Sequence, residues 1–300
     1  MTTATAKIEL IDGNWVGSFN GRKIVKSYDQ TRVVKMMAKA GHPKAEIIGA
    51  DVSKADEIDE QSDWNINERF GFVAQLTRMV AKRQAVSLIV TGPGGLGKTH
   101  TVREALEQAG LQDASGFDVV ESSRTFRVIK GYSTAKGLYR ELFQNQNSIL
   151  VFDDCDSIQK DPVALALLKG ALDSYDKRII SWNADMKDDD LPRSFQFNGG
   201  VIFISNYKRS QLDDALLTRA NCVDLAMTME QKLERMTVLA TSDKFMPTAE
   251  PKHKADALAL IVKLGADVRE LSLRTLQSVT RIRAAGGNWE QLATYTLTNR

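Results

Sequence analysis

Short apolar runs alternate with stretches of helical periodicity between about residues 65 and 205. Compact, mainly apolar runs of four or five residues, which predict buried strands, lie at 86–90, 149–152 and 201–204, and residues 126–129 are also β-like. Apolar positions recur at helical spacing, which predicts amphipathic helices, at 67–82, 99–108, 134–143 and 161–172. Strands that alternate with helices in this way predict an α/β domain built on a parallel sheet.

The patterns differ on either side of this region. After about residue 227 the chain predicts helices only, at 230–240, 254–264, 270–284 and 289–297. The N-terminal part is mixed, with extended chain at 8–16 around a turn at Asp12-Gly13, helices at 31–40 and 45–50, and an acidic stretch at 51–63. We therefore expect an N-terminal accessory segment, an α/β core and a small helical domain, at 1–63, 64–227 and 228–300.

Composition fits a globular protein of about two domains. The chain has 300 residues, of which 43% are hydrophobic and 26% charged, with a net charge of +2. This excludes a wholly disordered chain. The near-neutral balance predicts no nucleic-acid footprint over the chain as a whole, so any basic surface would be local.

The rarer residue types and the apolar runs narrow the class further. Two cysteines, Cys155 and Cys222, exclude a disulfide scaffold and favour a reducing compartment. The three histidines have no zinc-site spacing. No apolar run approaches the ~20 residues of a membrane helix, and the N-terminus lacks a signal-peptide pattern, so we expect a cytoplasmic protein without a membrane partner.

The most specific motif follows the first apolar run of the α/β region. It fits G-x-x-x-x-G-K-[ST] in full, with the residues Gly92, Pro93, Gly94, Gly95, Leu96, Gly97, Lys98 and Thr99. Its glycines let backbone N–H groups turn toward phosphate oxygens, and the following helix adds its N-terminal dipole. Lys98 is expected to reach the β- and γ-phosphates, and the Thr99 hydroxyl to hold Mg²⁺.

Two acids end the apolar run at 149–152. Asp153 is delivered by a buried strand next to the phosphate loop, which is where a Mg²⁺ ligand is needed. Asp154 follows it and is a candidate base for the attacking water.

Together these residues resemble the AAA+ ATPases, with some similarity to phage-encoded members. In that family four apolar residues precede Asp-Glu, often with another Asp two positions later; here the residues are Asp153, Asp154, Cys155 and Asp156. Asp154 thus stands in the position of the family's Glu and is one methylene shorter. This difference from the family bears on the rate of hydrolysis. Nucleotide binding is still expected.

The resemblance extends to three further positions. Asn206, after the apolar run at 201–204, matches the polar residue called sensor 1, which positions water against the γ-phosphate. Arg219, in the segment Asp-Asp-Ala-Leu-Leu-Thr-Arg-Ala, matches the arginine finger that reaches a neighbouring subunit's nucleotide. Arg274 matches the sensor 2 arginine of the helical lid, with Arg269 as an alternative.

What the resemblance implies is an ATPase that works with ATP and Mg²⁺ as a homo-oligomer, by analogy a hexameric ring. Its action on nucleic acid or nucleoprotein is one expectation; protein remodelling, assembly, or a slow nucleotide-gated scaffold is the alternative.

Two weaker features bear on this choice. Short strands at 179–182 and 195–197 predict a hairpin in the place where helicase-like relatives contact DNA. Its tip at 185–190 is mostly acidic, although it is flanked by Arg178, Arg193, Lys208 and Arg209. Tyr132 lies near the place of the pore loop in protein-unfolding relatives, and local packing is its simpler role.

Overall fold

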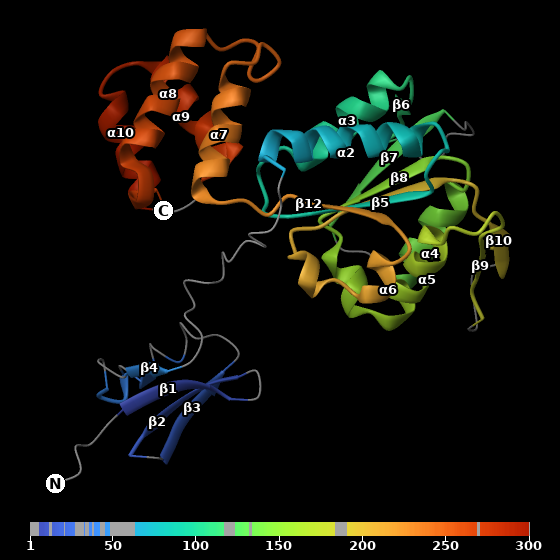
Figure 1. Ribbon diagram of the computed structural model, residues 1–300, viewed down its shortest axis with the longest axis horizontal. Coiled ribbons are helices and arrows are strands. Elements are labelled where there is room, and N and C mark those ends of the chain that lie inside the picture. The colour runs from blue at the N-terminus through green and yellow to red at the C-terminus, as the bar shows by residue number, and fades with distance from the viewer. Residues whose placement is uncertain are drawn as a thin grey trace. The chain divides into compact units, whose positions relative to one another are not determined.

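The computed structural model describes residues 6–11, 14–20, 22–27, 33, 36–37, 39–42, 46–48, 64–116, 124–131, 134–183, 191–268 and 271–299. The chain forms two compact units, residues 1–60 and residues 61–300. Figure 1 shows the elements of both units. The predicted acidic stretch at 51–63, the tip at 185–190, Tyr132 and Arg269 lie outside the described residues.

The first unit is built on a four-stranded sheet. Its strands are β1 (Ala6–Ile11), β2 (Asn14–Phe19), β3 (Arg22–Ser27) and β4 (Glu46–Ile48), in the order β3-β2-β1-β4. The strands β1 and β2 are antiparallel and pair up to Ile11 and Asn14, on either side of the predicted turn. The described positions between 33 and 39 are helical, as predicted.

The predicted helix at 45–50 is wrong. Residues 46–48 form β4, which pairs in parallel with β1 and places Ile47 opposite Ile8. β-Branched isoleucines suit a strand. The open edge of β1 supplies backbone hydrogen bonds to a segment almost forty positions later in the chain, and the local pattern of such a short segment carries no sign of that partner.

The second unit contains a six-stranded sheet with helices on both faces (Figure 1). Its strands follow the order β12-β5-β11-β8-β7-β6, and all neighbours are parallel. They are β5 (Ser87–Thr91), β6 (Gln112–Asp113), β7 (Thr125–Lys130), β8 (Ile149–Asp153), β11 (Gly200–Ile204) and β12 (Asn221–Asp224). The expected α/β parallel-sheet fold is therefore present.

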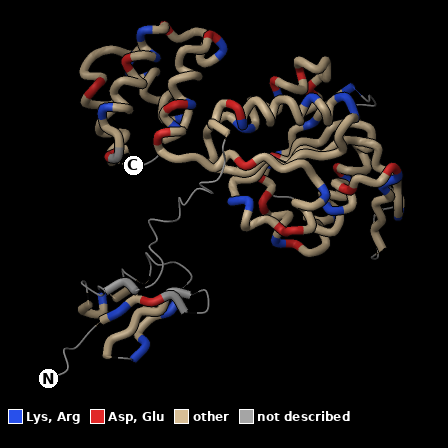
Figure 2. Tube along the Cα trace, viewed as in Figure 1, with Lys and Arg blue, Asp and Glu red and all other residues tan. Residues whose placement is uncertain are grey.

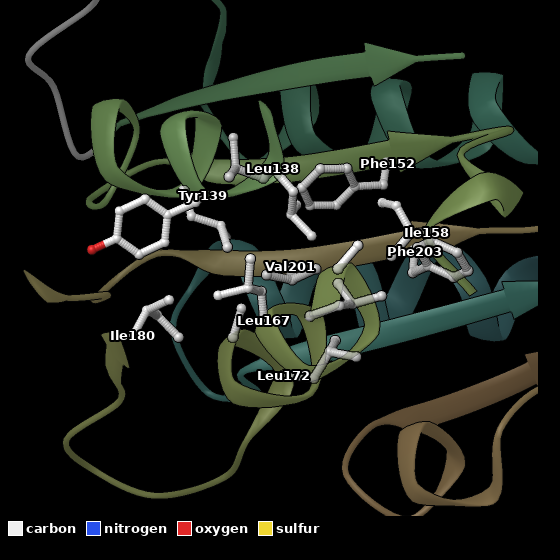
Figure 3. Close-up of a cluster of buried hydrophobic side chains, with 14 of the residues drawn as sticks. Leu138, Tyr139, Phe152, Ile158, Leu167, Leu172, Ile180, Val201 and Phe203 are labelled. Carbon is white, nitrogen blue, oxygen red and sulfur yellow. The ribbon is translucent and has the colours of Figure 1, made fainter. Parts of the chain in front are cut away.

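Two hydrophobic clusters fix the helices to the sheet. On one face lie α2 (Ile66–Ala81) and α3 (Lys98–Gln108), packed through Phe70 and Val102. On the other face lie α4 (Ala135–Gln144) and α5 (Pro162–Leu172), whose Tyr139 and Leu167 belong to one hydrophobic cluster with Phe152 of β8 (Figure 3). The central strands β5, β8 and β11 are buried along their whole length, which explains their continuous apolar sequence.

Shorter elements complete the core. The strands β9 (Ile179–Ser181) and β10 (Ser194–Gln196) form the predicted antiparallel hairpin. The helix α6 (Asp214–Leu217) and the 3-10 turns η2 (Asp156–Lys160) and η3 (Arg209–Gln211) connect strands to helices. The sequence reading missed β6, β12 and α6, because each is short or only partly buried.

A four-helix domain follows the sheet. Its helices are α7 (Met229–Ala240), α8 (Pro251–Leu264), α9 (Leu273–Ala285) and α10 (Trp289–Thr298), with the 3-10 turn η4 (Gly265–Asp267). They pack around Met236, Ile261, Leu276 and Val279. Arg69 of α2 donates to the backbone oxygens of Asp224 and Ala226 and ties the segment that leads into this domain to the core. Among the described helices, none is long and apolar enough to cross a membrane.

Arg178, expected at the base of the hairpin as a possible DNA contact, is buried instead. Its guanidinium donates to the Ala171 oxygen at 2.7 Å and the Gly199 oxygen at 2.5 Å, and lies 5.0 Å from the centre of the Phe197 ring. Burial lowers the pKa of Arg178 to about 10. It is therefore a structural link between α5 and the residue that precedes β11.

We expect Arg178→Met to lower the free energy of unfolding by about 2–4 kcal/mol, because two buried carbonyls lose charge-assisted donors. Arg193 lies in the same hairpin but is exposed, so Arg193→Met should change it by less than about 0.5 kcal/mol. Denaturant titration of both variants measures the difference. Equal effects would contradict the structural role of Arg178.

Candidate functional site

The polar residues singled out from the sequence follow neighbouring parallel strands. The strand β11 lies between β5 and β8, with Ile204 paired to Asp153 on one side and to Val90 on the other. The carboxyl ends of all three strands therefore meet at one edge of the sheet, where a doubly wound fold places its ligand.

The predicted phosphate-binding loop connects β5 to α3 at this edge. Gly92, Gly95 and Gly97 have φ values of +124°, +76° and +97°, a region that side chains beyond glycine rarely adopt. A Cβ on Gly92 would also lie 2.7 Å from the carbonyl carbon of Leu225. Gly92, Gly95 and Gly97 are thus required by the backbone conformation of the loop, while Leu96 is fully buried in the core.

Lys98, the first residue of α3, has an almost fully buried side chain. Its ammonium donates to the backbone oxygens of Gly92 at 2.6 Å and Pro93 at 2.9 Å, and to Oδ1 of Asn206 at 2.8 Å. Burial lowers the pKa of Lys98 to about 8, against the opposing effect of nearby carboxylates led by Asp154. A desolvated ammonium at the start of a helix is suited to bind phosphate oxygens.

Thr99 and Asp153 form a pair of oxygen ligands. The Thr99 hydroxyl donates to Oδ1 of Asp153 at 2.9 Å, and Asp153 is 3% exposed. A hydroxyl and a carboxylate side by side are hard oxygen donors of the kind that Mg²⁺ binds together with phosphate oxygens. The donor set present therefore fits the metal that the sequence predicts.

Asp154 and Asn206 are joined across the strand ends. The amide Nδ2 of Asn206 donates to Oδ1 of Asp154 at 2.6 Å. Asp154 has φ +57°, a left-handed conformation that Asp and Asn adopt more readily than longer residues. The Asn206 side chain thus contacts Lys98 with its oxygen and Asp154 with its nitrogen, and links the predicted phosphate-binding and water-activating groups.

A second link was not predicted. The Ser205 hydroxyl donates to Oδ1 of Asp156 at 2.6 Å and accepts from the backbone N–H of Tyr207 at 3.0 Å. It fixes the turn after β8 against the turn after β11. Ser205 carries no motif signal, because only the strand pairing brings it beside Asp156.

The helical domain closes the site. A cavity of about 510 Å³ is lined on the core side by the loop and strand-end residues and on the other by α7, α9 and the segment between α7 and α8. The backbone N–H of Leu273 donates to the Gly95 oxygen at 2.7 Å. Arg274, the first candidate for sensor 2, lines this cavity and contributes to the electrostatic field at Lys98.

Two lysines hold the segment between α7 and α8 at the cavity. Lys254 is buried and donates to the backbone oxygens of Ser242 at 3.1 Å and Phe245 at 3.2 Å. Lys244 forms an ion pair with Glu104 of α3. The sequence did not predict the ion pair of Lys244, because its two partners lie 140 positions apart.

Arg219 lies apart from the other candidates. It is not among the residues that line the cavity. Its Nη1 donates to the Ala215 oxygen at 2.8 Å, and its Nε lies 3.7 Å from Oδ2 of Asp173, with the side chain 37% exposed. The chain thus brings most of the predicted site residues together around one cavity, and Arg219 lies outside it, partly exposed.

Comparison with known proteins gives three results. Residues 88–231 match the family described as ATPase family associated with various cellular activities (AAA). An uncharacterized 36.7 kDa protein of Enterobacteria phage T4, from the nrdC-mobD intergenic region, is 29% identical over 265 residues, which cover 82% of this chain and 78% of that protein. The structure of PCH-2 from C. elegans covers 78% of this chain and 68% of its own, at 15% identity and a TM-score of 0.42, a likeness too low to bear on function.

The matched region begins in β5, just before the phosphate loop, and ends in α7, so it contains the loop, both strand-end acids, Asn206 and Arg219. The parallel sheet and the helical domain beside it agree with the AAA+ resemblance, and residues 88–231 are similar to the AAA ATPase family.

Proposed function

We propose that this protein binds ATP with Mg²⁺ in the cavity between the sheet and the helical domain, and hydrolyses it to drive a motor or switch. The observation that carries the proposal is the convergence of Lys98, Thr99, Asp153, Asp154 and Asn206 at one sheet edge. These groups supply charge compensation, metal ligation and a base for water, which are the parts that phosphoryl transfer needs.

Lys98 and the loop are assigned to the phosphates. The ammonium now has three oxygen acceptors, two of them backbone oxygens of the loop itself. Phosphate oxygens carry more charge than these neutral acceptors, so they compete well for the same donors. Binding would exchange neutral acceptors for charged ones without moving α3.

Thr99 and Asp153 are assigned to Mg²⁺, which when bound would neutralise charge that develops on the phosphates. The residues themselves need little reorganisation, because the hydroxyl and the carboxylate already lie 2.9 Å apart.

Asp154 is assigned to accept the proton of the attacking water, with Asn206 holding its carboxylate. An exposed carboxylate next to a fixed amide donor can receive a proton and keep its orientation. The left-handed backbone at Asp154 accounts for the shorter acid at this position, since Asp tolerates it better than Glu.

Arg219 is assigned to a neighbouring subunit's nucleotide. It is partly exposed and outside its own cavity, so it needs a second copy of the chain to reach a phosphate. The proposal therefore includes a homo-oligomeric ring, for which a hexamer is the expectation from the family. Arg274, which lines the cavity from α9, would connect nucleotide state to the position of the helical domain.

As the substrate of this motor we propose nucleic acid or nucleoprotein, on the analogy with phage-encoded members and with the phage relative in view. Acidic and basic residues are interspersed along the described part of residues 61–300 (Figure 2). A contact with nucleic acid would therefore be made by a local group of basic residues. The alternative function is protein remodelling, which is favoured if DNA does not stimulate ATP turnover in the experiment below.

Asp154→Asn should retain ATP binding and lose about 10²–10⁴-fold in turnover, because an amide keeps the backbone conformation and cannot take the proton. Lys98→Ala should lose binding itself. The matched control is Asp176→Asn, an exposed acid of the α5–β9 connection, with unchanged turnover. Calorimetric ATP binding and steady-state phosphate release distinguish the three, and normal turnover in Asp154→Asn would exclude Asp154 as the base.

Arg219→Ala should keep ATP binding and lose roughly 10³–10⁵-fold in turnover. Mixing it with Lys98→Ala subunits should restore part of the activity, because the Lys98→Ala subunit supplies the finger and the Arg219→Ala subunit supplies the intact site. Arg281→Ala, at an exposed arginine of α9, serves as the control. Failure to gain activity on mixing, in stable mixed oligomers, would contradict catalysis across an interface.

Single- or double-stranded DNA should raise ATP turnover several-fold, and the stimulation should fall steeply as salt rises from 50 to 200 mM, because phosphate contacts release counterions. The measurement is phosphate release at graded DNA and salt concentrations. Turnover that ignores both DNA forms at 50 mM salt would favour the protein-directed class instead.

A further inference from the structure

Lys130, which belongs to none of the motifs, forms an ion pair with Asp153, the predicted metal ligand. Lys130 is the last residue of β7, and the parallel pairing of β7 with β8 places it opposite Asp153. Its ammonium lies 3.0 Å from Oδ2 of Asp153. Since Thr99 donates to Oδ1, both carboxylate oxygens of Asp153 have a partner.

The two members of this ion pair differ in exposure. The Asp153 side chain is 5% exposed and the Lys130 side chain 63% exposed. A carboxylate that is buried to this degree needs a counter-charge, whereas the lysine reaches it from solvent and could leave at small cost. The ammonium of Lys98 is held by the loop oxygens and Asn206, so the direct ion pair of Asp153 among the described residues is the one with Lys130.

A metal ion and the Lys130 ammonium would compete for the carboxylate of Asp153. A metal ion beside Asp153 would stand next to the Lys130 ammonium, and like charges at that distance repel, more strongly in a cavity than in water. In the absence of metal, the ammonium removes a negative charge that would otherwise repel incoming phosphates. Lys130 is therefore expected to strengthen the binding of metal-free nucleotide and to weaken the binding of nucleotide with its metal.

We propose that Lys130 is a resident counter-ion of Asp153 that sets the Mg²⁺ requirement of nucleotide binding: it supports binding without metal and competes with the metal. The inference rests on the proposed nucleotide site and adds a positioning residue to it. A lysine with only a structural role would affect stability and leave the metal dependence of binding unchanged.

The test compares the wild type with Lys130→Gln, Lys130→Arg and the control Lys177→Gln. The exposed Lys177 lies in the α5–β9 connection, outside the cavity, and its substitution changes the net charge equally. Calorimetry gives the ADP dissociation constant in EDTA and at graded MgCl₂, at one ionic strength. Thermal unfolding of each variant shows that it is folded.

Lys130→Gln should weaken metal-free ADP binding by about three- to tenfold and lower the half-saturating MgCl₂ concentration by a similar factor, as for a partly exposed ion pair. The ratio of the metal-free to the Mg²⁺-saturated dissociation constant should thus rise. Lys130→Arg should stay within about threefold of the wild type, because it keeps the charge. Lys177→Gln should match the wild type.

A ratio that stays within about twofold of the wild type in folded Lys130→Gln would overturn the role of Lys130 and leave the nucleotide site standing. The same change in Lys177→Gln would overturn it too, as an effect of net charge. Wild-type protein that binds no ADP even at saturating MgCl₂ would overturn both this inference and the proposed function.

Discussion

The site depends on one buried ammonium. Lys98 begins α3 and holds the phosphate loop through the oxygens of Gly92 and Pro93, and it holds the end of β11 through Asn206. Because a buried charge must keep its partners, these three contacts bind loop, helix and strand into one arrangement. Asn206 then reaches Asp154, so the position of the candidate base follows from the position of the lysine.

The charged groups around this ammonium bear on how the proposed site would respond to nucleotide. Two further cations, Lys130 and Arg274, line the same cavity as the strand-end acids, and both are more exposed than Lys98. On the proposed function, a triphosphate with its metal would add charge of both signs there. The exposed cations could move to meet it, while Lys98 would stay fixed to α3. The helical domain is coupled to the same place through the hydrogen bond from Leu273 to Gly95.

The sequence was most informative where a contiguous pattern has a single structural explanation. The runs of β5, β8 and β11 are apolar because both faces of these strands are buried, and the glycine-rich loop shows its need for positive φ. In β12 only Val223 is buried, so this strand has no continuous apolar run that would predict it. At 46–48 the predicted helix was replaced by a strand, because pairing with β1 lies outside any local window. Lys130 was missed for a related reason, since only the register of β7 against β8 places it at Asp153.

The most direct test of the account is a crystal structure of the protein with an ATP analogue and Mg²⁺. The account predicts that the Lys98 ammonium contacts phosphate oxygens in place of at least one loop carbonyl, with the metal between Thr99 and Asp153. It would be contradicted by a complex in which Lys98 keeps its contacts with Gly92, Pro93 and Asn206 and the triphosphate lies elsewhere.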